Sequence, residues 1–210
     1  MADDTTRRDG RPAGLLGVNL PPSPWVERFL AGAPAGRPVL DLACGGGRHA
    51  RLAARLGFDV VAVDRQPEIV AALANAANIT PRVFDLEVGA PWPFEPGRFG
   101  AVIVTNYLHR PLLADIAAAI SDDGVLIYET FAVGHERYRM PSNPDFLLKP
   151  NELLPPVLAA GLVVVGFEQG ERPAGPDGRN DGRDGGIVQR IAAVGPAHPW
   201  ALATPRSLDG

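Results

Sequence analysis

The segment with the clearest chemical potential runs from Val39 to Ala50. It reads as an apolar strand that contains Asp41, a turn with three consecutive glycines from Gly45 to Gly47, and the start of a helix. Glycines let the backbone turn sharply and let a ligand approach without meeting a side chain. The helix start adds backbone N–H groups that can meet an anionic or polar ligand. The segment therefore predicts a site for a nucleotide-like cofactor.

Two further acids stand at the predicted ends of the next two strands. Asp64 ends an apolar run that starts at Asp59, and Asp85 ends a run that starts at Arg82. In parallel nucleotide-binding sheets, a carboxylate at the end of the second strand accepts hydrogen bonds from ribose hydroxyls. Acids on three successive strands, counting Asp41, are a more specific signal than the glycines alone.

This combination resembles the first motifs of class I S-adenosylmethionine-dependent methyltransferases. In that family an acidic residue precedes alternating glycines: Asp41 matches the acid, and Gly45 and Gly47 match the second and third glycines. Ala43 replaces the first glycine, which adds only a methyl group. The resemblance implies S-adenosylmethionine as the cofactor, with Ala43, Cys44, Gly45 and Gly47 against its methionine part and Asp41 orienting it.

The resemblance also assigns the adenosine half of the cofactor to residues that follow the second and third strands. It implies that Asp64 binds the ribose and that Arg65 and Gln66 flank the adenine. Asp85 then takes the adenine amino group, and the backbone N–H of Leu86 meets the ring. The chain is further similar to small bacterial methyltransferases of the tellurite-resistance type.

Residues after the fourth and fifth strands are the candidates for the catalytic chemistry. The family lines the pocket beneath the transferable methyl group with the segment after the fourth strand, here Thr105, Asn106 and Tyr107. Tyr107, His109 and Glu129 are the predicted catalytic residues, because they lie near the edge where such sheets bind ligands. A base such as His109 or Glu129 can remove the proton of a hydroxyl or amine acceptor, whereas a thiolate needs none.

The elements that must position these residues alternate between β-branched apolar runs and helical patterns. This alternation predicts an α/β fold, a Rossmann-like three-layer sandwich with a seven-stranded, mostly parallel sheet. A hairpin of the last two strands makes the last strand antiparallel. The predicted strands are Val39 to Ala43, Asp59 to Asp64, Arg82 to Asp85, Ala101 to Thr105, Val125 to Phe131, Leu162 to Glu168 and Ile187 to Val194.

Helices are predicted at residues 48–56, from Pro67 onward, at 111–120 and, interrupted by two prolines, at 151–160. Residues 122–124 predict a turn into the fifth strand. The methyltransferase domain is expected to span residues 15–195, between a disordered segment 1–14 and a flexible tail 196–210. Residues 171–186 predict a mobile loop, and 134–146 a substrate lid.

The amino-acid composition indicates which kinds of binding partner to expect. The net charge of −4 over 210 residues argues against a broad surface for nucleic acid and favours a small-molecule methyl acceptor. The longest apolar runs are strand-sized, which argues against a membrane partner. The single cysteine, Cys44, excludes an internal disulfide and favours a cytoplasmic location. The sequence has no cysteine pair and no clustered histidines with the spacing of metal ligands, so we expect no metal site. The sequence leaves the oligomeric state open.

Two alternatives remain. A nicotinamide-dependent oxidoreductase, binding NAD(P), fits because Gly45-x-Gly47-x-x-Ala50 matches the dinucleotide pattern and Asp64 serves its ribose equally well. A non-catalytic nucleotide-binding module fits the same residues. Asp41, Asp85 and the terminal hairpin favour the methyltransferase. We interpret Cys44 as a turn residue.

Two further residues also have predicted positions. His49 is expected on the surface of its helix or on the cofactor side of it. Trp25 is expected to anchor a helix in the core.

Overall fold

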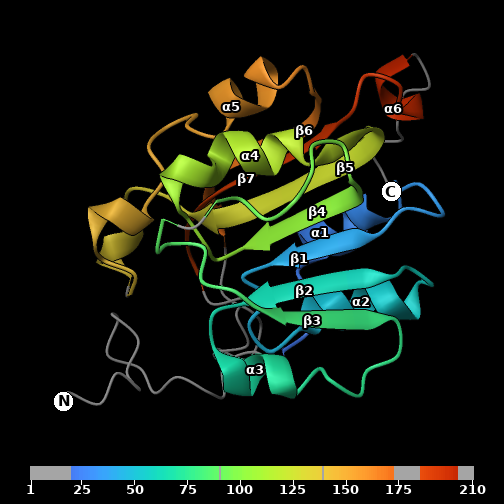
Figure 1. Ribbon diagram of the computed structural model, residues 1–210. Helices are drawn as coiled ribbons and strands as arrows, with labels where there is room; N and C mark the ends of the chain where they lie inside the picture. The colour runs from blue at the N-terminus through green and yellow to red at the C-terminus, as the bar shows by residue number, and fades with distance from the viewer. Residues whose placement is uncertain (1–19, 90, 139, 173–184, 203–210) are drawn as a thin grey trace.

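The computed structural model describes residues 20–89, 91–138, 140–172 and 185–202. Seven strands form one sheet in the order β3-β2-β1-β4-β5-β7-β6 (Figure 1). β7 runs antiparallel to both neighbours, and the other six strands are parallel to one another. The predicted fold class is therefore confirmed. The strands are β1 (Val39–Leu42), β2 (Val60–Asp64), β3 (Ile79–Val83), β4 (Phe99–Thr105), β5 (Ile120–Phe131), β6 (Val163–Arg172) and β7 (Gly186–Val194).

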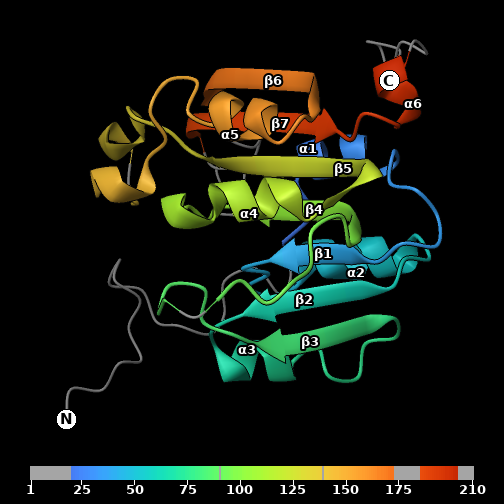
Figure 2. The same ribbon diagram turned by 45° about the horizontal axis from the view of Figure 1, so that its top comes forward.

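Helices cover both faces of the sheet. The α-helices are α1 (Pro24–Leu30), α2 (Arg48–Arg55), α3 (Pro67–Ala71), α4 (Leu113–Ala118), α5 (Leu154–Ala159) and α6 (Pro199–Leu202). Three short 3-10 helices are η1 (Arg110–Leu112), η2 (His135–Arg137) and η3 (Pro144–Phe146). Figures 1 and 2 show α4 and α5 on one face and α1 and α2 on the opposite face, which gives the three layers.

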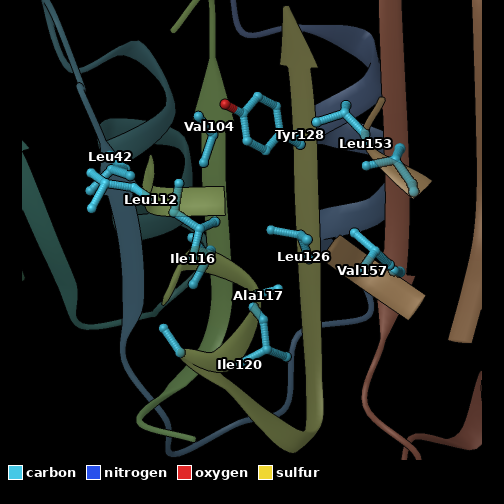
Figure 3. Close-up of a cluster of buried hydrophobic side chains, with 14 of the residues drawn as sticks. Leu42, Val104, Leu112, Ile116, Ala117, Ile120, Leu126, Tyr128, Leu153 and Val157 are labelled. Carbon is cyan, nitrogen blue, oxygen red and sulfur yellow. The ribbon is translucent and has the colours of Figure 1, made fainter. Parts of the chain in front are cut away.

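The central strands β4 and β5 belong to two hydrophobic cores, one on each face. Their side chains alternate between the cores, and because both faces are covered, the strands read as unbroken apolar runs. Figure 3 shows the core beneath α4 and α5, where Tyr128, Leu126 and Val104 meet Ile116 and Val157. The core beneath α1 and α2 takes the intervening residues Ala101, Ile103, Val125 and Ile127.

The third strand lies earlier than predicted, at Ile79–Val83 instead of Arg82 to Asp85. The observed strand includes Pro81, and proline has no N–H to donate to a ladder. In the structure β3 is an edge strand that pairs only with β2, so this missing donor costs no hydrogen bond within the sheet. Asp85 consequently lies two residues beyond the strand end.

The predicted turn at residues 122–124 is wrong, because β5 already begins at Ile120. The register between β4 and β5 shifts between Phe99 and Ala101, and this irregularity accommodates the Asp-Asp-Gly sequence inside the strand. The carbonyls of Asp122 and Gly124 accept hydrogen bonds from the N–H groups of Ala197 and Gly195. A contact distant in sequence thus replaces the local turn.

The predicted helix at 151–160 is shorter in the structure, as α5. Its prolines, Pro155 and Pro156, fall in the first turn, where helix N–H groups lack intrahelical partners and proline is tolerated.

The structure differs from the expected flexible tail over residues 196–202. There His198 is buried and its Nε2 lies 2.8 Å from the carbonyl oxygen of Gly32, while the Trp200 ring packs on Phe29. The predicted disordered segment 1–14, residues 203–210 of the tail, and residues 173–184 of the predicted mobile loop lie outside the described residues.

The strand order places a topological switch point between β1 and β4. From β1 the chain proceeds to β2 and β3 on one side, and then returns to place β4 and β5 on the other. In open α/β sheets, ligands bind in the crevice at the carboxyl ends of the strands that flank such a point. Among the described residues no helix is long and apolar enough to cross a bilayer.

Candidate functional site

The turn after β1 is tight and rich in left-handed backbone. Ala43, Gly45 and Gly47 have φ angles of 52°, 50° and 73°, respectively. A side chain is strained in this region, so Ala43 takes a conformation better suited to the glycine that it replaces in the family's motif. A Cβ at Gly47 would lie 2.6 Å from Cδ2 of Leu73, so this glycine is also required by close packing.

Asp41 joins the central strand to the start of α2. It is buried, and its Oδ2 accepts a hydrogen bond of 2.8 Å from the backbone N–H of Ala50. Burial raises the pKa of Asp41 to about 8, and the Ala50 bond opposes that rise only in part. Asp41 therefore fixes the helix to the strand behind the glycine turn, and a cationic ligand in that turn would favour its charged form.

Asp64 closes the same turn from the end of β2. One carboxylate oxygen accepts the N–H of Gly45 at 2.9 Å, and the other accepts the N–H of Gln66 at 3.1 Å. Its side chain is buried, while Arg65 beside it is exposed. The structure thus brings the predicted ribose acid and the glycine turn into direct contact.

The segment after β3 brings a third acid to this edge. Asp85 accepts the backbone N–H of Glu87 at 2.9 Å, and Leu86 between them packs partly against the core. The negative charges of Glu87, Asp85 and Asp64 all help to raise the pKa of Tyr107, so these carboxylates act electrostatically on its hydroxyl. The predicted adenosine-binding residues are therefore gathered at one edge of the sheet.

Two buried polar atoms at this edge have no hydrogen-bond partner within the described part of the chain: the hydroxyl of Tyr107 and Oε1 of Gln66. Desolvation raises the pKa of Tyr107, and the nearby acids add to the rise, so the hydroxyl stays protonated as a donor. A buried polar group without a partner is costly. Both atoms therefore point to a polar ligand that would satisfy them, as the adenosine part of a cofactor can.

The end of β4 connects to α2 and α1 through His49. Oγ1 of Thr105 lies 3.3 Å from Nδ1 of His49, and Nε2 of His49 accepts the backbone N–H of Ser23 at 3.1 Å. His49 is buried, which corrects the expectation of a helix-surface position and leaves the cofactor side. Burial lowers its pKa to about 3, so the ring is neutral and Nδ1 is its donor. Asn106 follows with a φ of 54° and is exposed.

Glu129 lies on β5 but faces α1 and is engaged by cations. Its carboxylate is buried, 3.0 Å from Nη1 of Arg172 and 3.4 Å from Nη1 of Arg190. The hydroxyl of Ser23 donates to both of its oxygens at 3.3 and 3.4 Å. The carboxylate is thus already engaged by two guanidinium groups and a hydroxyl of the protein. The geometry therefore does not favour a base role for Glu129.

The structure also contains a cavity of about 710 Å³, whose lining includes none of the predicted cofactor residues. Its walls come from the segment after β3, the segment after β4 and the predicted lid after β5. His109 lines it, unlike Glu129, and is thus the predicted base with access to an acceptor. The lining residues are Glu87, Leu108, His109, Arg110, Pro111, Met140, Pro141, Asn143, Asp145 and Phe146.

The structure also shows where Cys44 and Trp25 lie. Cys44 is buried in the turn and burial raises the pKa of its thiol, which agrees with a turn residue rather than a reactive thiolate. Trp25 anchors α1 in the core, and its Nε1 donates to the carbonyl of Ile191 at 3.3 Å. Within the residues that the structure covers, no group of three metal-ligating side chains occurs.

Sequence reasoning missed Ser23, Glu87 and the arginines 172 and 190. Glu87 had a local signal, since it follows Asp85 by two residues at the predicted binding edge. The arginines had none, because their approach to Glu129 depends on the register of the β5-β7-β6 sheet, where Arg190 stands opposite Glu129.

Residues 39–124 match the model of a family described as a methyltransferase domain. A comparison of the chain with curated proteins found no match.

Solved structures with a similar fold include three methyltransferases. An S-adenosylmethionine-dependent methyltransferase from Mesorhizobium loti is 16% identical in sequence. The match covers 85% of this chain and 100% of that chain, with a TM-score of 0.62. A TehB-like S-adenosylmethionine-dependent methyltransferase from Corynebacterium glutamicum is 20% identical, with 81% and 86% covered and a TM-score of 0.53. Phosphoethanolamine N-methyltransferase 2 from Haemonchus contortus, in complex with S-adenosylhomocysteine, is 20% identical, with 80% and 52% covered and a TM-score of 0.59. At these identities the likeness shows the fold, which is that of Rossmann-like methyltransferases.

Proposed function

We propose that this chain is an S-adenosylmethionine-dependent methyltransferase that acts on a small-molecule acceptor. The observation that carries the proposal is the contact between the Asp64 carboxylate and the N–H of Gly45. It joins the predicted ribose acid to the glycine turn at the switch point, within the segment that matches a methyltransferase domain. The unpartnered hydroxyl of Tyr107 at the same edge supports a polar ligand there.

The residues present fit the cofactor. Ala43, Cys44, Gly45 and Gly47 would hold its methionine part, with Asp41 behind the turn. Its adenosine part would be held by a second group of residues, Asp64, Arg65, Gln66, Asp85 and Leu86. When bound, the sulfonium supplies a methyl group already activated for transfer to a nucleophile.

The protein then has to align the acceptor, exclude water and handle its proton. Thr105, Asn106 and Tyr107 lie at or just after the end of β4 and would shape the floor beneath the methyl group. His109 lines the cavity and would accept the proton of a hydroxyl or amine acceptor. Glu129 would act by holding α1 against β5 through Ser23, rather than as a base.

Several further expectations rest on the sequence alone. The comparisons do not favour the nicotinamide-dependent alternative, whereas a binding module without turnover shares every cofactor-site residue named above. The likeness to the tellurite-resistance type also stays a prediction from the sequence. The cytoplasmic location, the lid function of residues 134–146, and the absence of metal, membrane and nucleic-acid partners also stay predictions.

Calorimetric titration tests the proposed cofactor. S-adenosylmethionine and S-adenosylhomocysteine are expected to bind, and Asp64→Ala is expected to weaken both by about tenfold or more because a ribose ligand is lost. Asp59→Ala is the matched control, since Asp59 is an exposed acid just before the other end of β2. Binding of NAD(P) in place of both sulfur compounds would overturn the proposal.

A further inference from the structure

Among the described residues that line the cavity there is one arginine, Arg110, and its guanidinium is already engaged by the protein. Nε of Arg110 donates to Glu152 at 2.6 Å, and Nη2 donates to the same carboxylate at 3.1 Å. Nη1 donates to the carbonyl of Asp145 at 2.6 Å, and Nη2 also donates to the carbonyl of Leu147 at 2.8 Å. With each of its nitrogens directed at protein oxygens, Arg110 supports the cavity wall and is not available to an anionic ligand.

Two further carboxylates of the same cavity have no direct ion-pair partner among the described residues, although the charge of Asp145 also acts on Arg110. Glu87 and Asp145 both line it, and neither side chain forms an ion pair or hydrogen bond within the described ranges. Glu87 is fixed through its backbone N–H, which donates to Asp85, and its carboxylate stays available. Because the Arg110–Glu152 pair is neutral, the cavity presents an excess of negative charge to a ligand.

The rest of the lining is apolar or neutral. Leu108, Met140 and Phe146 provide apolar surface, and His109 provides an imidazole. A ligand that matches these walls has a positive group for the carboxylates and an apolar group for the remainder.

From this charge balance we infer that the acceptor is a small cationic amine with an apolar substituent, selected by Glu87 and Asp145. The inference rests on the proposed methyl transfer, and adds the chemical class of the acceptor. An acceptor carboxylate would meet two like charges and, among the described lining residues, no cation that is not already engaged, and a neutral alcohol would leave both carboxylates without a counter-ion.

The transfer moves one methyl group to nitrogen and releases one proton. The ammonium form binds and loses one proton to His109, from which it passes to solvent, so that the nitrogen gains a lone pair. This lone pair forms the new bond to the methyl carbon. The bond between that carbon and sulfur breaks with its electron pair left on sulfur, which yields the methylated ammonium and S-adenosylhomocysteine.

The test is a panel of acceptors that share one apolar group and differ in the reacting group. It contains 2-phenylethylamine, 2-phenylethanol, 3-phenylpropionate and 2-phenylethanethiol, with shorter and longer alkylamines added. Release of S-adenosylhomocysteine measures turnover, and calorimetric titration of each compound into the S-adenosylhomocysteine complex measures binding. At least one amine is expected to bind and to be methylated with a kcat/KM about tenfold or more above its alcohol and carboxylate counterparts.

Variants connect the preference to the two carboxylates. Glu87→Gln and Asp145→Asn are each expected to raise KM for the amine about five- to tenfold with a smaller change in kcat. Glu87→Lys is expected to shift binding toward the carboxylate. Glu95→Gln is the control, because Glu95 is an exposed acid outside the cavity lining, and it is expected to leave both constants unchanged.

The outcomes separate this inference from the proposed function. Tight cofactor binding together with preferred turnover of the carboxylate, the alcohol or the thiol overturns the amine acceptor and leaves the methyltransferase intact. Failure of every amine to bind the S-adenosylhomocysteine complex also overturns it. Failure of the cofactor itself to bind contradicts the methyltransferase.

Discussion

Nε2 of His49 lies 3.1 Å from the backbone nitrogen of Ser23 and accepts its N–H. Through this bond the first helical turn of α2, which follows the glycine turn, is connected to the N-cap of α1. The Ser23 hydroxyl in turn donates to Glu129 on β5. The buried Ser23 thus connects α1 and, through His49, α2 to Glu129 on β5.

Replacement of His49 by glutamine is expected to lower the free energy of unfolding at pH 7.5 by about 1–3 kcal/mol, because the Ser23 N–H or the Thr105 hydroxyl loses its partner. Urea unfolding measures the change. His109→Gln is the control, since no hydrogen bond of the His109 side chain occurs among the described residues, and its stability is expected to change by less than about 0.5 kcal/mol. Equal stabilities of the two variants would argue against the connecting role of His49.

The His49→Gln variant is also expected to change the pH dependence of stability. Burial lowers the pKa of His49 from 6.5 to about 3, so the unfolded chain binds a proton between these values and the folded chain does not. The stability of the native protein therefore falls as pH falls through this window, by about 2–3 kcal/mol at pH 4.5 from this residue. Urea unfolding at pH 7.5 and 4.5 should show the gap between native protein and His49→Gln narrowing at pH 4.5. A gap independent of pH would contradict the buried neutral ring.

Asp41→Asn is expected to have opposite effects on stability and cofactor affinity. Burial raises the pKa of Asp41 from 3.8 to about 8, so the folded chain binds more protons than the unfolded chain between these values, and stability falls as pH rises. The asparagine lacks this penalty and can still accept the Ala50 N–H. Relative to the native protein, the variant should gain a few kcal/mol of stability between pH 5 and 9, measured by urea unfolding.

Cofactor titration completes that experiment. Because Asp41 is expected to orient the methionine part, the Asp41→Asn variant should bind S-adenosylhomocysteine more weakly at pH 8. An unchanged affinity would assign Asp41 a structural role only.

Glu129→Gln tests whether Glu129 is a structural anion. Removing the buried charge leaves Arg172 and Arg190 without their shared counter-ion, which is expected to cost about 3 kcal/mol of unfolding free energy. Glu168→Gln is the matched control, because Glu168 pairs with the same Arg190 but is half exposed, and its loss should cost less than about 1 kcal/mol. A stable Glu129→Gln variant with a selectively reduced kcat would instead restore Glu129 as the base.

The sequence predicts best what depends on local pattern. The buried strands β1, β2 and β4 lie within a few residues of their predicted bounds, because apolar runs between turn residues specify them. The acids Asp41 and Asp64 lie next to the glycine turn for the same reason, since each stands at a fixed offset from a strand end, whereas their contacts with a cofactor stay predictions.

The remaining differences come from contacts that local patterns do not encode. Asp122 and Gly124 have turn chemistry, but the strand forms because their carbonyls meet residues 195–197. Pro81 is compatible with β3 only because that strand is at the sheet edge. Likewise Glu129 resembles a base by position, and only the register of β7 shows that Arg190 faces it.

The most direct test of the central claim follows a labelled methyl group. S-adenosylmethionine with a carbon-14 methyl group is incubated with the protein and the acceptor panel, and both labelled product and S-adenosylhomocysteine are quantified. We predict equal amounts of the two, retained in Asp59→Ala and lost in an Asp64→Ala protein whose unfolding transition shows that it is folded. Cofactor binding without formation of S-adenosylhomocysteine across the whole panel would contradict the proposed methyl transfer and leave a binding module.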